Sequence, residues 1–172
     1  GRAVAACVLF ASESTIRFVG TYGPTAAMTP RCSSSTPGLR EARALNSFLT
    51  EEMDLSFRKG WPFMAAGDFN SFPSLRLGRK GGLFALRSES LPVSLLSRGA
   101  IDTFRCRHPL LEAYTCIHSN GTASRLDQIW FALTPPQPVN ILNAAIINDP
   151  RHVRDHLIPL LDIGSSTPSV PV

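Results

Sequence analysis

The spacing of hydrophobic and polar positions changes several times along the chain, and each change marks an expected element. Residues 3–10 and 15–22 are apolar or β-branched runs on either side of "ASES", which predicts two antiparallel strands joined by a short turn. From residue 39 to about 59, apolar residues recur at intervals of three and four, which predicts an amphipathic helix. The apolar run 61–69 then predicts a buried strand ending in "GDFN".

The remaining elements follow from shorter patterns. Residues 71–84 predict a loop, and 90–101 predict a short helix that ends at a glycine. The segment 114–131 predicts an antiparallel hairpin around "SNGT", and two last strands are expected at 139–149 and 156–163. Strands outnumber helices, and helices fall between pairs of strands. This pattern favours a mixed α/β layered fold over a regular βαβ alternation.

Composition limits the class of protein. A chain of 172 residues fits one domain, and 44% hydrophobic with 17% charged residues is typical of a globular protein rather than a disordered one. The formal net charge of +4 is compatible with a polyanionic partner but does not require one. No apolar run reaches the roughly 18 residues of a membrane span, and no signal peptide is visible, so we expect an intracellular protein without membrane contact.

The cysteines predict neither a disulfide framework nor a zinc site. Cys7, Cys32, Cys106 and Cys116 form no CxxC pair, and two of them lie in apolar runs, which indicates buried free thiols. The chain starts at Gly1 inside a strand pattern and without an initiator methionine, and we expect it to be a piece of a longer protein.

Polar residues stand at the ends of expected strands. Asp68 and Asn70 follow the first buried strand, Asp127 interrupts an alternating run, and Asp155 and His156 precede the last strand. An aspartate after a glycine is most often a turn residue, and a lone histidine is often a surface residue. An aspartate inside a strand needs a partner, because a half-buried carboxylate otherwise loses its hydration. The functional interpretation therefore requires that these stretches meet in space.

Four stretches taken in chain order resemble the endonuclease/exonuclease/phosphatase superfamily, which has a Y-x-P-N stretch, a GDFN strand end, an S-R-[IL]-D strand and a final [ST]-D-H. The matching stretches here are "YGP" at 22–24, "GDFN" at 67–70, "SRLD" at 124–127 and "DH" at 155–156. The resemblance runs from about residue 3 to 163. It implies a four-layered α/β/β/α sandwich that lacks its first strands, with a partial domain at 1–163 and a flexible tail at 164–172.

A narrower resemblance lies in "IDTFRCRHPLLEAYTCIHSNGTASRLDQIWF". This stretch looks like part of the endonuclease domain of non-LTR (LINE-type) retrotransposons, which is similar to apurinic/apyrimidinic endonucleases. In such enzymes Mg²⁺ and acidic residues cut a DNA phosphodiester. For Arg105, His108 and Tyr114 we favour a structural interpretation, in which they brace the loop before the hairpin.

The resemblance also implies roles for individual residues. Asp68 matches the acid that positions or deprotonates the attacking water, and Asn70 would hold that water or the phosphate. Asp127 matches the acid that orients His156, which would donate a proton to a phosphate oxygen as charge builds. Tyr22 matches a phenol that contacts the phosphate.

The resemblance further implies a metal and a nucleic-acid partner. Asp155, with Asp68 and Asn70, would hold Mg²⁺, with Mn²⁺ as an alternative, since hard divalent ions prefer oxygen ligands. DNA is the expected partner and the nucleus the expected location. The cations expected to contact nucleic acid are Arg76, Arg79, Lys80 and Arg125.

The sequence departs from the family pattern at several points. The superfamily has an Asn and a metal-binding Glu on strands that precede the matched region, and Thr25 stands where an Asn is common. Arg154 replaces a small hydroxyl residue two positions before His156. We therefore expect the isolated chain to cut DNA poorly. The alternatives to a nuclease are a catalytically inactive remnant and a phosphatase of the same superfamily that acts on a small phosphoester.

Overall fold

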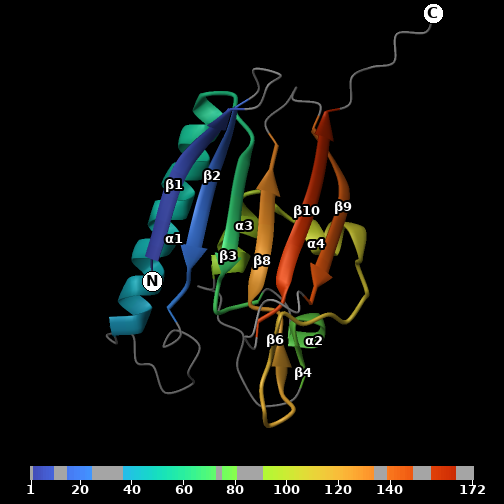
Figure 1. Cartoon of the computed structure of the whole chain (residues 1–172). Coiled ribbons are helices and arrows are strands. Elements are labelled where there is room, and N and C mark those ends of the chain that lie inside the picture. The colour runs from blue at the N-terminus through green and yellow to red at the C-terminus, as the bar shows by residue number, and fades with distance from the viewer. Residues whose placement is uncertain are drawn as a thin grey trace, which may run out of the picture.

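The computed structural model describes most of the chain, namely residues 2–9, 15–24, 37–72, 75–80, 91–133, 139–148 and 156–165. The strands are β1 (Arg2–Leu9), β2 (Thr15–Tyr22), β3 (Phe63–Asp68), β4 (Arg79–Lys80), β5 (Ile101–Asp102), β6 (Cys116–Ile117), β7 (Ala123–Ser124), β8 (Asp127–Ala132), β9 (Val139–Ile147) and β10 (Ile158–Ser165). The helices are α1 (Pro37–Arg58), α2 (Leu75–Gly78), α3 (Leu91–Ser97) and α4 (Thr103–Arg107). Figure 1 shows the mixed α/β architecture that the sequence predicted.

A five-stranded sheet of order β1-β2-β3-β8-β5 forms the centre of the molecule. β2 and β3 run parallel, and the other neighbouring pairs are antiparallel. A parallel pair needs a long crossover connection, and α1 lies in the one between β2 and β3. A two-stranded ribbon of β9 and β10 lies beside β8, and a small sheet of order β4-β7-β6 extends beyond one end of the central sheet (Figure 1).

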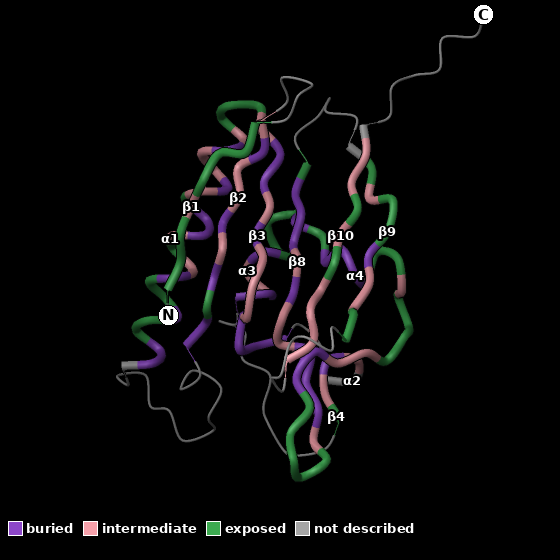
Figure 2. Tube along the Cα trace, viewed as in Figure 1, coloured by how far each residue is buried: buried purple, intermediate pink, exposed green. Residues whose placement is uncertain are grey.

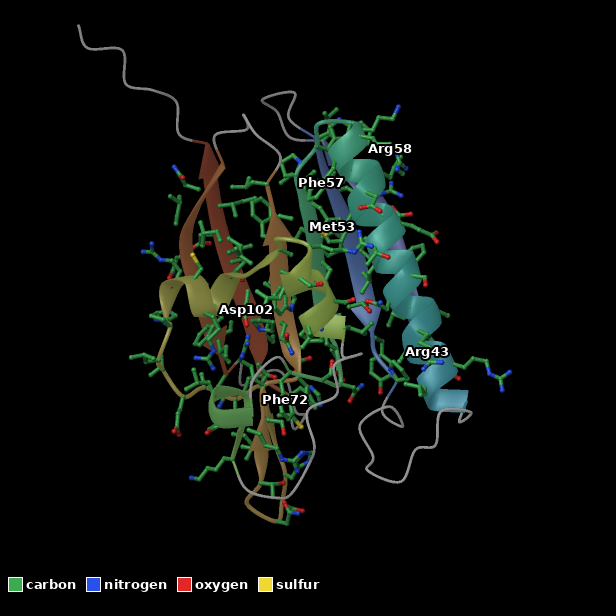
Figure 3. The ribbon with its side chains drawn as sticks, turned by 180° about the vertical axis from the view of Figure 1, so that it is seen from behind. Arg43, Met53, Phe57, Arg58, Phe72 and Asp102 are labelled. Carbon is green, nitrogen blue, oxygen red and sulfur yellow. The ribbon has the colours of Figure 1, made fainter. Side chains whose placement is uncertain are left out.

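Helices α1, α3 and α4 lie on one side of the central sheet, the side that faces the viewer in Figure 3. The three- and four-residue spacing in α1 puts Leu45, Leu49 and Met53 on one buried stripe, which packs on the sheet. The strands contribute large buried side chains, including Phe63 and Trp130, each with 0% exposure. Burying a side chain of this size stabilises the fold by about 1.5–3 kcal/mol.

The opposite face of the sheet is only partly covered. Because side chains alternate along a strand, Met64, Ala66 and Asp68 point away from the helix-covered core, as do their cross-strand partners on β8. Met64 and Ala66 are half-buried, and β1 is exposed along nearly its whole length, as Figure 2 shows. Asp68 therefore lies on the sheet face that the helices leave open.

The longer predicted elements are confirmed. The two N-terminal strands pair in antiparallel register from Arg2↔Tyr22 to Leu9↔Thr15. The predicted amphipathic helix is α1, the buried strand is β3, and the two C-terminal strands are β9 and β10. β10 continues to Ser165, two positions beyond 163, and residues 166–172 lie outside the described part of the chain.

Shorter elements differ from the prediction. The segment 71–84 was expected to be a loop, but it contains α2 and β4. The structure also has β5 and α4 at 101–107, a segment for which no element was predicted. The predicted hairpin is confirmed only at its tip, where β6 pairs with β7. The chain then leaves this small sheet, and β8 pairs with β3 and β5. Past Ser124 the backbone bonds to other parts of the chain, since Arg125 N–H donates to the Gly78 carbonyl and the Leu126 carbonyl accepts from the Phe69 N–H.

The cysteine prediction was correct in part. Cys7, Cys106 and Cys116 form no disulfide, as expected, but among these three only Cys116 is buried. Cys7 is exposed because β1 is an edge strand that the helices barely cover. Cys32 lies outside the described residues. Among the helices that the structure describes, none is both long and apolar enough to cross a membrane.

Gly67 allows the close approach of β2 and β3 beside Asp68. Its φ of 140° lies in a region that L side chains rarely adopt, and a Cβ there would overlap the Thr21 carbonyl oxygen. We expect Gly67→Ala to lower the free energy of unfolding by about 2–3 kcal/mol or more in urea denaturation. Gly60→Ala is the matched control, because Gly60 has a φ of 68° and open space around it. It should cost about 1 kcal/mol. Equal effects of the two substitutions would contradict this account.

Candidate active site

Three side chains from distant parts of the sequence meet at one end of the central sheet. Asp68 ends β3 and faces Asp127, the first residue of β8, in the antiparallel register. His156 Nδ1 lies 2.7 Å from Asp127 Oδ2. One ligand atom from each of the three residues lies within 4.8 Å of the others, and among the described residues this is the group suited to hold a metal ion. The convergence required by the functional interpretation is therefore present.

Asn70 fixes the orientation of the Asp68 carboxylate. Its backbone N–H donates to Asp68 Oδ1 at 2.8 Å, and its side-chain Nδ2 donates to Asp68 Oδ2 at 3.3 Å and to the Gly23 carbonyl at 2.8 Å. Asn70 has a φ of 47°, a left-handed conformation that asparagine tolerates better than most residues. The turn in "GDFN" thus folds the amide back onto the carboxylate and ties both to the segment after β2.

The environment of Asp68 favours its neutral form. Burial is the main cause that raises the pKa of the Asp68 carboxyl above its ordinary value, and the negative charge of Asp127 adds to this effect. The hydrogen bonds from Asn70 and the nearby imidazole of His156 act in the opposite direction. A carboxylate with a raised pKa holds a proton more readily, which is the property that a general base requires.

Asp127 and His156 form a hydrogen-bonded pair in which the imidazole ring is partly accessible to solvent. The Asp127 carboxylate accepts from Nδ1, so the proton on this nitrogen is assigned from the contact. The side chain of Asp127 is 14% exposed and that of His156 is 31% exposed. The pair is thus sheltered on the carboxylate side and accessible to solvent on the imidazole side. Nε2 is the ring nitrogen that this contact leaves for another partner.

The other predicted catalytic and metal residues have different outcomes. Tyr22 pairs with Asp68 across the parallel β2–β3 register, and its side chain is 52% exposed, so it lies at the same end of the sheet. Asp155 lies outside the described residues, and so do Thr25 and Arg154. The predicted metal role of Asp155 stays a prediction.

The cations predicted to contact nucleic acid divide into two groups. Arg79 and Lys80 form β4, which lies beyond the end of the central sheet where β3 ends and β8 and β10 begin (Figure 1). Arg79 is half-buried and Lys80 is exposed. Arg76 belongs to α2, and its side chain lies outside the described part of the structure. The segment therefore lies at the end of the molecule that holds Asp68, and its contact with DNA stays a prediction.

The prediction for Arg125 was wrong. Its side chain is 2% exposed, and its guanidinium forms a two-pronged ion pair with Asp102, with Nη1 at 3.1 Å from Oδ1 and Nη2 in contact with Oδ2. The guanidinium carbon also lies 5.7 Å from the centre of the Phe104 ring. Because these buried partners occupy the guanidinium, Arg125 supports the start of β8 from within and is not available to a phosphate.

The structural interpretation of the loop before the hairpin agrees with the contacts of Arg105 and His108, whereas Tyr114 donates to Glu112, two positions away. The Arg105 guanidinium donates to three backbone carbonyls, those of Leu77, His108 and Leu111. His108 Nε2 lies 2.8 Å from the Ala144 carbonyl of β9. These bonds join α2, the loop after α4 and the β9–β10 ribbon, and so brace the region beside the site.

Sequence reasoning missed three residues that support the site. Asp102 is the partner of Arg125 and also caps α4 by accepting from the Arg105 N–H. Gln128 Nε2 donates to the Ser71 carbonyl at 2.5 Å, which joins β8 to the turn after Asp68. Thr115 accepts from the Asp127 N–H at 2.9 Å. None was selected as a site residue, although all three lie inside the stretch 101–131 that carries the narrower resemblance.

The donor set fits a hard divalent cation. Asp68 and Asp127 offer carboxylate oxygens on facing positions, and Mg²⁺ typically takes one or two protein carboxylates with water completing its shell. Two facing carboxylates repel each other, and a cation between them would offset that repulsion. His156 is less suited to a hard ion, because its Nδ1 already contacts Asp127 and its chemistry favours proton transfer.

Comparisons with known proteins identify the fold. No family model and no curated protein matches the sequence. Among solved structures, the chain is similar to the 3′ phosphatase NExo from Neisseria bound to product DNA hairpin, with 18% identity, a TM-score of 0.61 and coverage of 93% of this chain and 64% of that one. The APE2 catalytic domain from Xenopus laevis has 17% identity and a TM-score of 0.61, with 95% and 55% covered. An endonuclease/exonuclease/phosphatase family protein from Leptotrichia buccalis has 16% identity and a TM-score of 0.55, with 94% and 52% covered.

The fold is therefore that of the endonuclease/exonuclease/phosphatase proteins, as the sequence motifs predicted. The chain spans between about half and two thirds of the length of these solved structures. The similarity covers 93% of this chain in the first of these structures.

Asp68→Asn tests the electrostatic cost at the site. Because the pKa of the Asp68 carboxyl is raised in the folded protein, folding favours its protonated form. At low pH, where the carboxyl is protonated, Asp68 does not lower the free energy of unfolding. As the pH rises through the pKa that Asp68 has in the folded protein, the carboxyl ionises and the free energy of unfolding falls. An asparagine keeps an oxygen to accept the Asn70 N–H and stays neutral at every pH. In EDTA, urea denaturation should therefore show a larger free energy of unfolding than wild type near pH 7, and the difference should shrink below about pH 4.

Asp162→Asn on β10 is the matched control, because Asp162 is exposed and should show no such pH-dependent gain. An Asp68→Asn variant that is less stable than wild type at neutral pH would contradict the burial argument.

Arg125→Ala tests the corrected role of Arg125. Removing the guanidinium leaves the buried Asp102 carboxylate without its ion-pair partner, and we expect a loss of about 3–5 kcal/mol in the free energy of unfolding. Lys80→Ala removes an exposed cation of the neighbouring small sheet and should change stability by less than about 0.5 kcal/mol. A small effect of Arg125→Ala on thermal or urea unfolding would show that Asp102 does not depend on this pair.

Proposed function

We propose that this chain carries the catalytic residues of a metal-dependent nuclease domain that hydrolyses DNA phosphodiester bonds, of the kind found in LINE-type retrotransposons. The Asp127–His156 hydrogen bond beside the Asp68 carboxylate is the observation that carries the proposal. Phosphodiester hydrolysis needs a group that takes a proton from water and a donor toward the phosphate, and this cluster offers one of each.

Asp68 is the proposed general base. Its raised pKa brings the carboxylate closer to the pH at which proton transfer from water is effective, and Asn70 holds both carboxylate oxygens in a fixed orientation. Since the Asn70 amide nitrogen donates to Asp68 and Gly23, we assign Asn70 to orienting the base and not to direct contact with the water.

His156 is the proposed donor to the phosphate. With Nδ1 held by Asp127, an imidazolium would donate from Nε2 to a phosphate oxygen where negative charge develops. The Asp127 carboxylate stabilises that positive charge and keeps the ring in one orientation. Tyr22, which is exposed on the neighbouring strand, would add a phenolic hydrogen bond to the same phosphate.

Mg²⁺ is the proposed cofactor, with Mn²⁺ as the alternative. Asp68 and the facing Asp127, with the predicted ligands Asn70 and Asp155, would hold it, and the ion would supply charge neutralisation at the phosphate. The family pattern adds a glutamate from strands that precede the matched region. We therefore propose that the 172-residue chain by itself binds the ion loosely and cuts slowly.

DNA is the proposed substrate, and the nucleus the proposed location. One of the similar structures is described as a 3′ phosphatase with product DNA hairpin bound, which supports a nucleic-acid substrate class. Arg79 and Lys80 at the same end of the molecule supply positive charge for backbone phosphates. The "FRCRHP" and "SRLD" stretches are the sequence support for the retrotransposon type over a phosphatase of small phosphoesters.

A plasmid-nicking assay tests the proposal. The 172-residue chain and a chain that includes the coding sequence upstream of Gly1 are compared with Mg²⁺, with Mn²⁺ and with EDTA. We expect metal-dependent nicking that is faster in the longer chain, and a loss of about 10²-fold or more in Asp68→Ala and His156→Ala, because each removes one partner of the proton transfers. Arg43→Ala and Asp162→Asn, at exposed positions outside the cluster, are the matched controls and should nick at the wild-type rate.

Three outcomes would count against the nuclease proposal. Nicking that persists in Asp68→Ala would show that the cluster does not perform the reaction. Phosphate release from small phosphoesters without nicking would favour a phosphatase. No nicking by either chain would favour a remnant that folds but does not cut.

A further inference from the structure

Thr115 lies where three parts of the chain meet behind the Asp127–His156 pair. It precedes β6 and has 0% exposure, so its hydroxyl can contact only protein. The backbone N–H of Thr115 donates to the Ser124 carbonyl at 3.0 Å, which ties it to β7. Its other polar groups contact the segments that carry Asp127 and His156.

The Thr115 hydroxyl oxygen accepts from two successive backbone N–H groups, those of Leu126 at 3.0 Å and Asp127 at 2.9 Å. These residues lie at the junction where the chain leaves the small sheet and enters β8. At that junction the strand ladder cannot satisfy every N–H group, and a buried N–H without a partner is costly. A hydroxyl oxygen has two acceptor positions, and both are used here.

The Thr115 carbonyl contacts the other member of the pair. It accepts from the Leu157 N–H at 2.5 Å, and the neighbouring Cys116 forms a β-bridge with His156. Asp127 and His156 are separated by 29 positions in the sequence. The Asp127 backbone and the backbone of Leu157, the residue after His156, are nevertheless both bonded to Thr115. A shift of Thr115 would therefore move the two segments that carry the Nδ1–Oδ2 contact.

We propose that Thr115 is a positioning residue that sets the Asp127–His156 contact through its side-chain hydroxyl. The carbonyl bond to Leu157 survives any substitution, but the two bonds to the Asp127 segment depend on the hydroxyl oxygen. Loss of that oxygen releases the start of β8 from the hairpin while the core contacts of β8 with α1 and α3 remain. The expected effect of this change on catalysis rests on the proposed function. Its expected effect on the Asp127–His156 hydrogen bond does not.

Thr115→Val removes the acceptor with little change of shape, and Thr115→Ser retains it. Thr50→Val on α1 is the matched control, because Thr50 is also nearly buried and its hydroxyl bonds only to the Ser47 carbonyl within the helix. The protein is measured by NMR in EDTA. Backbone amide hydrogen exchange reports the Leu126 and Asp127 N–H bonds, and the Nδ1–H resonance of His156 reports its hydrogen bond to Asp127.

In Thr115→Val we expect the Leu126 and Asp127 amides to exchange about 10-fold faster or more, relative to core amides such as Val19 and Ala65, and the His156 Nδ1–H resonance to be lost. Thr115→Ser and Thr50→Val should resemble wild type in both signals. Unchanged exchange and an unchanged His156 resonance in Thr115→Val would overturn the proposal, and so would the same losses in Thr50→Val.

If Thr115→Val does not fold, Thr115→Ala is compared with Thr115→Ser, because both lack the γ-methyl and differ only in the hydroxyl. Global unfolding of both hydroxyl-free variants would overturn the proposal, since Thr115 would then support the whole fold and not the pair.

In the nicking assay, Thr115→Val should lower the turnover rate about 10-fold or more with little change in KM for DNA. If the NMR signals change as expected and wild type does not nick, the positioning role stands and the proposed function fails.

Discussion

The antiparallel register between β3 and β8 is the constraint on which the site depends. It pairs Phe63 with Ala132 at one end and Asp68 with Asp127 at the other. Side chains alternate along both strands, so the same register that places Phe63 and Trp130 in the helix-covered core places the two carboxylates together on the open face. A shift of one residue would move every core side chain to the wrong face of the sheet, and the packing of α1 and α3 therefore fixes the distance between the two acids.

This register brings two negative groups into facing positions, which is unfavourable by itself. The structure offsets part of the cost through hydrogen bonds, with Asn70 donating to Asp68 and His156 to Asp127. Burial still raises the pKa of Asp68. The site is thus less stable than a neutral arrangement of the same residues. A raised pKa of this kind is typical of functional sites, where a carboxylate binds a cation or takes part in proton transfer.

Buried polar contacts hold the residues between β7 and β8 and the start of β8 in position. Arg125 pairs with Asp102, Thr115 receives the N–H groups of Leu126 and Asp127, and Gln128 reaches the turn after Asp68. These contacts replace the ladder bonds that the chain loses where it passes from the small sheet to the central sheet. The ion pair with Asp102 of β5 also explains why Arg125 of the "SRLD" motif faces inward.

The sequence by itself determined the long elements and the identity of the motif residues. The apolar periods of α1, β2 and β3 are strong because each element buries one face, and four motifs in order were enough to indicate the fold and to select Asp68, Asn70, Asp127 and His156. Tertiary structure decided the break between β7 and β8, the two short helices α2 and α4, and the inward direction of Arg125. Segments this short have too few residues for a period to show, and the partners of their polar groups come from distant parts of the chain. The hydrophobic pattern of a sequence predicts which side chains are buried. The partner of a buried charge depends on which strands lie next to each other, and only the tertiary structure determines that.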